Sequence, residues 1–169
     1  MPEIPKPDYD DPKEVFAFFF LSYYQAAVLE RGVLNLAVAM LAKRVPGITA
    51  GDVEKLYESF DKFTFGKVIQ AAKEKADIPS DLEVDLALAL QKRNYLAHRF
   101  FVAHDIDFMM SSGRRKMIDE LVQILEHLQS VDTRMDDIWM RAWESFGITK
   151  EWIEQKTREF VSERHNCGQ

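Results

Sequence analysis

The segment MIDELVQILEHLQSVDTRMDDIWMRA, residues 117–142, decides the fold of this chain. Its apolar residues recur at steps of three and four, which is the spacing of the buried side of an amphipathic helix. This stripe consists of Met117, Leu121, Leu125, Leu128, Met135, Ile138 and Ala142. Helix-breaking residues flank this segment, Ser111-Ser112-Gly113 before it and Gly147 after it. The sequence therefore predicts one long helix between these two breaks.

The remaining sequence predicts further helices joined by short connections. We expect them over residues 12–44, 52–62, 64–76, 80–104 and 149–161, with Pro46-Gly47 ending the first and the capping box Ser80-Asp81-Leu82-Glu83 starting the fourth. Residues 1–12 contain four prolines and predict an extended arm. The expected fold is therefore all-α: a single domain over residues 13–165, built as a bundle of four to five main helices.

Composition excludes several classes of protein. The 169 residues include only 7 Gly and 6 Pro, too few for the many turns of an all-β fold. The one cysteine, Cys167, permits neither a disulfide framework within the chain nor a cysteine metal cluster. The N-terminus lacks the pattern of a signal peptide, and the apolar run at residues 15–29 is too short to span a membrane. We therefore expect a cytoplasmic protein that does not enter the membrane.

The helix predicted over residues 80–104 carries two apolar stripes, which is typical of a central, buried helix. One comprises Leu82, Leu86, Ala89, Arg93, Leu96 and Phe100, and the other Val84, Leu88, Gln91, Tyr95, His98 and Val102. Arg93 and His98 interrupt these stripes, and a buried charge is costly unless it is paired or in use. Each also has a structural explanation: Arg93 would pair with an acidic residue of a neighbouring helix, and His98 would be a hydrogen-bonded core histidine.

The segment Arg93-Asn94-Tyr95-Leu96-Ala97-His98 resembles the Arg-Asn-x-x-x-His signature of HEPN-domain proteins. The apolar residues 86–90 before it and the aromatic pair Phe100-Phe101 after it are also similar to that family. The specific resemblance covers about twenty residues, and the order of helices is similar across most of the chain. It implies an all-α domain that forms a homodimer and, in the catalytic members, cleaves RNA without a metal or other cofactor.

The resemblance also implies a role for each residue of the motif. His98 would act as general acid or base, since histidine is suited to proton transfer near neutral pH. Arg93 would bind the scissile phosphate and stabilise transition-state charge, and Asn94 would orient the histidine or the phosphate. Arg93 and His98 lie about 140° apart around a helix, so one copy does not form a compact site, whereas two copies in a symmetric dimer could.

The protein carries a net charge of −6, so RNA binding requires a local basic site. Residues 91–116 provide one, with six basic side chains against two acidic ones. Besides Arg93, the candidate substrate-binding residues are Lys92, Arg99, Arg114, Arg115 and Lys116. No histidine, cysteine or carboxylate spacing predicts a metal site, and we interpret Asp132, Asp136 and Asp137 as a solvated face.

Three hypotheses remain open at this stage. The first is a HEPN-type endoribonuclease that leaves 2′,3′-cyclic phosphate ends, of the toxin or phage-defence type, restrained by an antitoxin or another regulatory protein. The second is a dimeric binding or assembly module without catalysis, with nucleotide, RNA or protein as its partner. The third is a structural bundle in which the motif is coincidental.

Overall fold

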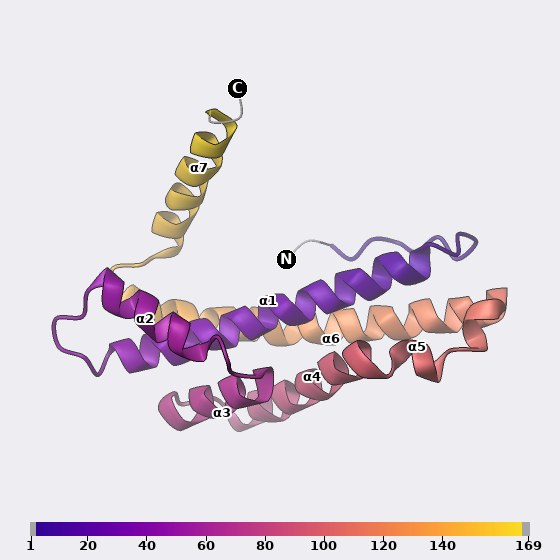
Figure 1. Ribbon diagram of the computed structural model, residues 1–169, viewed down its shortest axis with the longest axis horizontal. Helices are drawn as coiled ribbons and strands as arrows, with labels where there is room; N and C mark the ends of the chain where they lie inside the picture. The colour runs from indigo at the N-terminus through magenta and orange to yellow at the C-terminus, as the bar shows by residue number, and fades with distance from the viewer. Residues whose placement is uncertain (1–2, 167–169) are drawn as a thin grey trace.

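The computed structural model describes residues 3–166, and within this range all regular structure is helical (Figure 1). The elements are α1 (Glu14–Ala42), α2 (Ala50–Phe60), α3 (Phe65–Lys75), α4 (Ser80–His98), α5 (Phe100–Ala103), the 3₁₀ helix η1 (Asp107–Met109), α6 (Ser111–Glu144) and α7 (Lys150–Asn166). The all-α prediction is confirmed. Cys167 lies outside the described residues.

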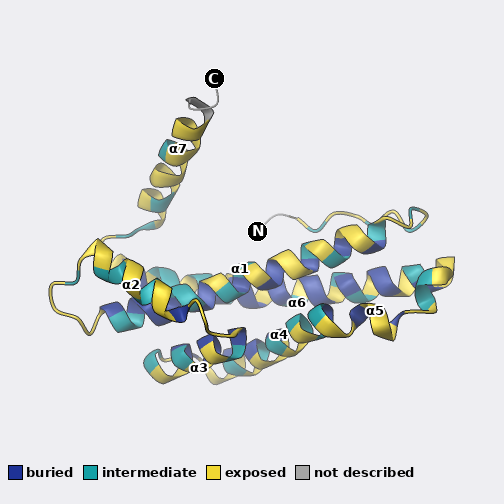
Figure 2. Ribbon diagram, in the orientation of Figure 1, coloured by how far each residue is buried: buried dark blue, intermediate teal, exposed yellow. Residues whose placement is uncertain are grey.

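Helices α1 and α6 form the centre of the bundle and run side by side, with α3 and α4 against them (Figures 1 and 2). The predicted stripe of α6 is buried from Met117 to Met135, and it packs with the apolar side of α1, including Leu29 and Val33. By length and composition alone α1 could cross a membrane, but 56% of its most apolar window is buried inside the bundle. This burial fits the prediction of a core helix.

Helix α4 differs from the prediction of a helix buried on both sides. Its first stripe is buried, from Leu82 to Leu96, but Val84 and Leu88 of the second stripe are 69% and 40% exposed. The helix therefore lies at the periphery of this chain. The expected capping box at its start is also absent, because Pro79 is the N-cap and Ser80 already lies within the helix.

The interruption predicted at Ser111-Ser112-Gly113 is wrong, because these residues form the first turn of α6. Gly113 is buried there against the backbone of Asp107 in η1. Small residues at this position thus allow two backbones to approach closely rather than breaking the helix. Conversely, the helix predicted over residues 80–104 contains a break that the sequence did not predict. It stops at His98, and the chain resumes a helical conformation in the short α5.

Asp132 corrects the interpretation of the acidic residues of α6 as a solvated face. It is only 3% exposed, and its Oδ2 accepts a 2.8 Å hydrogen bond from Nε2 of Gln25 on α1. Its other carboxylate oxygen has no hydrogen-bond partner among the described residues. Burial is the main cause that raises the pKa of Asp132 to about 6, and the charge of Asp136 adds to the rise.

We predict that Asp132→Asn makes the protein more stable at pH 8 but not at pH 4. In the native state the carboxyl binds its proton up to about pH 6, whereas it ionises near pH 4 in the unfolded chain. The free energy of unfolding therefore falls as the pH rises through this window, by at most about 3 kcal/mol. Urea unfolding of both proteins at the two pH values measures the effect. The exposed Asp137→Asn is the control, and equal pH dependence of all three proteins would contradict the prediction.

Candidate functional site

The motif residues lie in the last two turns of α4, and the break that follows determines their surroundings. The helix ends at His98 because Arg99 adopts φ −131° and ψ −25°, outside the helical region. The chain then continues into α5, where Phe100 is buried in the core. Leu96 and Phe100 anchor this junction, whereas His98 and Arg99 between them are exposed. The sequence thus places His98 at an exposed helix end.

Arg93 is half-buried, with 30% of its side chain exposed, beside α1. Its Nη1 donates a 3.2 Å hydrogen bond to Oδ1 of Asn94. Its Nη2 lies 4.0 Å from Oε2 of Glu30, which is at the outer limit of an ion pair. The predicted pairing of Arg93 with an acidic residue of a neighbouring helix is therefore present. Because the two groups are this far apart, most of the guanidinium's hydrogen-bond donors stay available for a ligand.

His98 is exposed rather than a core histidine. The structure assigns its ring no hydrogen-bond partner among the described residues, and Asn94, one helical turn earlier, is exposed as well. Both ring nitrogens are thus accessible to a substrate or to a second protein chain. One copy of the chain presents Arg93, Asn94 and His98 at one helix end, where Arg93 is half-buried and the other two side chains are exposed.

The structure divides the predicted basic region into two groups. Lys92 and Arg99 lie with the motif on α4 and at its end. Arg114, Arg115 and Lys116 lie in the first turns of α6, and all three already contact the protein. The Nη1 of Arg114 donates to the carbonyl of Phe108, Lys116 pairs with Asp107 at 2.9 Å, and the Arg115 guanidinium lies 4.2 Å from the ring centre of Tyr9. A phosphate would have to compete with these contacts, whereas the exposed Arg99 has no ion-pair partner among the described residues.

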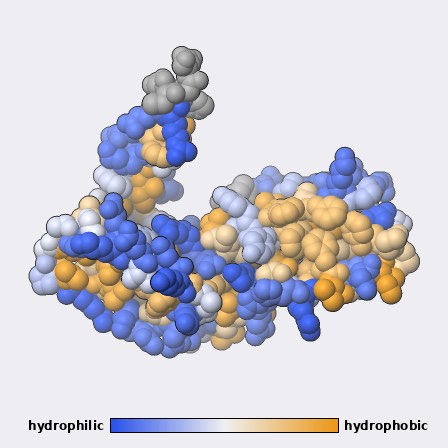
Figure 3. All heavy atoms as spheres, in the orientation of Figure 1, coloured by the Kyte–Doolittle hydropathy of each residue, from blue (hydrophilic) through white to orange (hydrophobic). Residues whose placement is uncertain are grey.

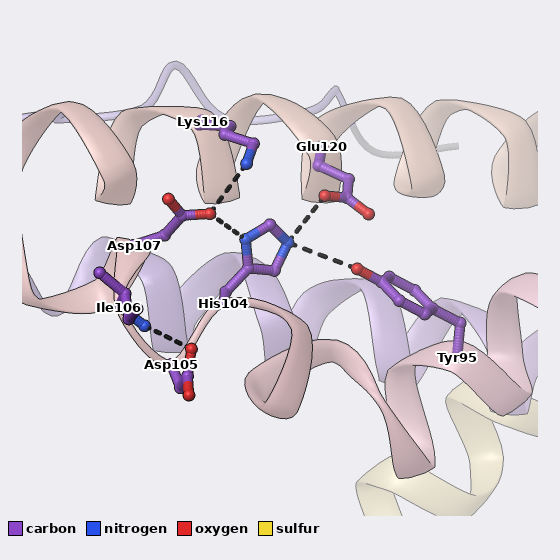
Figure 4. A network of polar contacts seen from close by, with 7 residues as sticks. All are labelled: Tyr95, His104, Asp105, Ile106, Asp107, Lys116 and Glu120. Atoms are coloured by element: carbon purple, nitrogen blue, oxygen red, sulfur yellow. Dashed lines mark hydrogen bonds and ion pairs between the residues drawn. The ribbon is translucent and has the colours of Figure 1, made fainter.

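A buried polar network that the sequence analysis did not single out is centred on His104 (Figure 4). His104 is 4% exposed, with Nδ1 2.8 Å from Oδ2 of Asp107 and Nε2 2.8 Å from Oε2 of Glu120. The ring thus lies between two carboxylates, one facing each of its nitrogens. The local signal is the three-residue spacing of His104 and Asp107, whereas Glu120 lies 16 residues after His104, on α6.

The same network holds the segment between α5 and α6 against the bundle. The Tyr95 hydroxyl lies 3.3 Å from Nε2 of His104, and burial, together with the neighbouring Glu120, raises the pKa of Tyr95 to about 12. Tyr95 therefore stays neutral at physiological pH. The hydrogen bond from Lys116 is the main cause that lowers the pKa of Asp107, and the hydrogen bond from His104 lowers it further. These contacts tie α4, η1 and α6 together beside the motif.

Among residues 3–166, no group of three or more histidine, cysteine or carboxylate side chains is arranged to hold a metal ion. No protein-family model matches the sequence, and comparison with curated proteins and with solved structures gave no match. The resemblance to HEPN proteins therefore depends on the motif, its flanking residues and the order of the helices.

Proposed function

We propose that this protein is a metal-independent endoribonuclease of the HEPN type, acting as a homodimer with a composite Arg93 and His98 site. The observation that carries the proposal is the exposed His98, which has no hydrogen-bond partner among the described residues. It lies on the helix that also presents a half-buried arginine bonded to Asn94. The toxin or phage-defence role and a regulatory partner protein are part of this proposal.

The chemistry needs only groups that the two copies would supply. The ribose 2′-hydroxyl attacks the adjacent phosphorus, its proton passes to an imidazole, and the bond to the 5′-oxygen of the next nucleotide breaks. A protonated imidazole returns a proton to that leaving oxygen, so the products are a 2′,3′-cyclic phosphate and a 5′-hydroxyl end. Arg93 would stabilise the negative charge that develops on the phosphate oxygens, and Lys92 and Arg99 would bind the flanking backbone.

The test is incubation of the purified protein with mixed RNA in EDTA, followed by analysis of the fragment ends. We expect cleavage that leaves cyclic phosphates, and a loss of about a hundredfold or more for Arg93→Ala. Lys150→Ala, which removes an exposed cation on α7, is the matched control and should cleave as the wild type does. Cleavage that EDTA abolishes, or an Arg93→Ala protein with full activity, would contradict the proposal.

A second candidate is a dimeric binding module without catalysis. The contact between Arg93 and Glu30 favours it, because the Glu30 carboxylate offsets part of the positive potential that Arg93 would apply to the transition state of cleavage. Under this alternative the wild type binds RNA or a nucleotide without cleaving it, and Glu30→Gln strengthens that binding by releasing Arg93.

A further inference from the structure

An exposed aromatic surface lies beside the motif, on the N-terminal half of α1 and on α5. It is defined here by Phe16, Phe20, Tyr23, Tyr24, Phe101 and Val102, which are between 38% and 71% exposed. In the space-filling view a continuous apolar area covers this end of the molecule (Figure 3). The largest contiguous apolar patch on a globular protein is often functional, so this aromatic surface is a candidate interaction site.

Most rings of the aromatic surface pack against one another rather than standing isolated. Phe16 lies 5.9 Å from Phe101, and the half-buried Phe19 lies 4.8 Å from Phe101 and 5.6 Å from Phe20, measured between ring centres. Phe19 also stacks on Tyr23 at 6.2 Å. The rings hold one another in place, so a partner would meet a preformed surface. The side chains of this surface would lose little conformational entropy on binding.

We infer that a second copy of this chain covers the aromatic surface, in a symmetric dimer whose contact is formed by α1 and α5. The exposed fractions of its five aromatic residues correspond to about 500 Å² of apolar surface, at roughly 200 Å² for each side chain. A standard interface covers about 800 Å² on each partner, of which somewhat more than half is apolar. The surface is therefore large enough to form the apolar part of a stable dimer.

The charges around the aromatic surface support this choice of partner. Asp10, Asp11 and Glu14 precede or begin α1 with a single cation, Lys13, among them, and the exposed Arg99 directly precedes α5. Negative charge at the start of α1 would repel an anionic membrane surface. A surface bordered by both signs of charge can instead be complementary to a copy of itself, as a two-fold contact requires.

This inference deepens the proposed function. It rests on the proposed function only because the composite site requires a second copy of the chain. Phe100 and Phe101 follow His98 closely in the chain, so a dimer contact on α5 and α1 lies next to the motif. The aromatic surface itself is argued from exposure, packing and charge, without reference to catalysis.

The experiment is sedimentation equilibrium of the full chain over a wide concentration range, with Phe20→Asp and Phe160→Asp variants. Phe20 and Phe160 are 66% and 56% exposed, so both replacements should fold, and Phe160 on α7 is the matched control. We expect a wild-type dimer, an unchanged Phe160→Asp dimer, and a dissociation constant raised about a thousandfold for Phe20→Asp, because the replacement occurs twice in each dimer.

A wild-type protein that stays monomeric at every concentration would overturn the inference. This outcome includes a monomer that binds neutral lipid vesicles through Phe20. The inference would also be overturned by a Phe20→Asp protein that dimerises as tightly as the wild type, or by dissociation caused by Phe160→Asp alone. RNA cleavage is measured on the same samples. A dimer that fails to cleave RNA would argue against the proposed function but keep the assigned surface, whereas an active monomer would argue against both the surface and the composite site.

Discussion

Replacing His98 with alanine is expected to lower the rate of RNA cleavage by about 10²- to 10⁴-fold, the contribution typical of a positioned general acid or base. The same replacement should leave the free energy of unfolding within about 0.5 kcal/mol of the wild type, because the ring is exposed and has no hydrogen-bond partner among the described residues. The rate is measured on a defined RNA in EDTA, and stability by urea unfolding.

Gln91→Ala provides the matched control for His98→Ala. Gln91 is an exposed residue of the same helix and the same sequence stripe, so its replacement changes the surface of α4 without removing a titratable group. We expect this variant to cleave RNA at the wild-type rate. Equal losses in the two variants, or no loss in His98→Ala, would remove His98 from the chemistry.

Gly113→Ala is expected to destabilise the protein by about 2 kcal/mol and to lower the melting temperature by roughly 4–8 °C. A Cβ atom at this position would lie 2.5 Å from Cα and 2.6 Å from the carbonyl carbon of Asp107, and it would also collide with the carbonyl oxygen. These are backbone atoms, so η1 must move to relieve the collision. Such a movement would also displace the Asp107 carboxylate from His104.

The control for this prediction is Gly51→Ala in α2. Nothing lies within 4 Å of a Cβ atom there, so alanine should stabilise the helix by about 0.5–1 kcal/mol through its higher helix propensity. The two variants make the same chemical change in helices and differ only in the space available. Thermal unfolding that shows Gly113→Ala to be as stable as Gly51→Ala would contradict the packing described here.

The sequence predicted the helices well because their apolar periodicity is a local property. The stripe of α6 and the buried side of α1 can be read directly from spacings of three and four residues. Positions decided by contacts between separate structural elements were predicted poorly. The role of Gly113 depends on η1, and the burial of Asp132 depends on Gln25, 107 residues away in the chain.

The candidate site shows the same division between local and distant contacts. The motif was found from the residues that interrupt the apolar stripes of α4, and the exposure of His98 and the half-burial of Arg93 agree with groups available to a ligand. The burial of α4 on both sides was predicted wrongly, because a second apolar stripe does not say whether this chain or a partner covers it. His104 was missed because one of its carboxylate partners, Glu120, lies on another helix.

The composite site across a homodimer is tested most directly by mixing the inactive Arg93→Ala and His98→Ala proteins. If Arg93 of one copy works with His98 of the other, each mixed dimer contains one intact site. After exchange of subunits, half of the dimers are mixed, so about a quarter of the wild-type activity should return. A mixture that remains as inactive as either variant alone, although subunit exchange is demonstrated, would contradict the composite site.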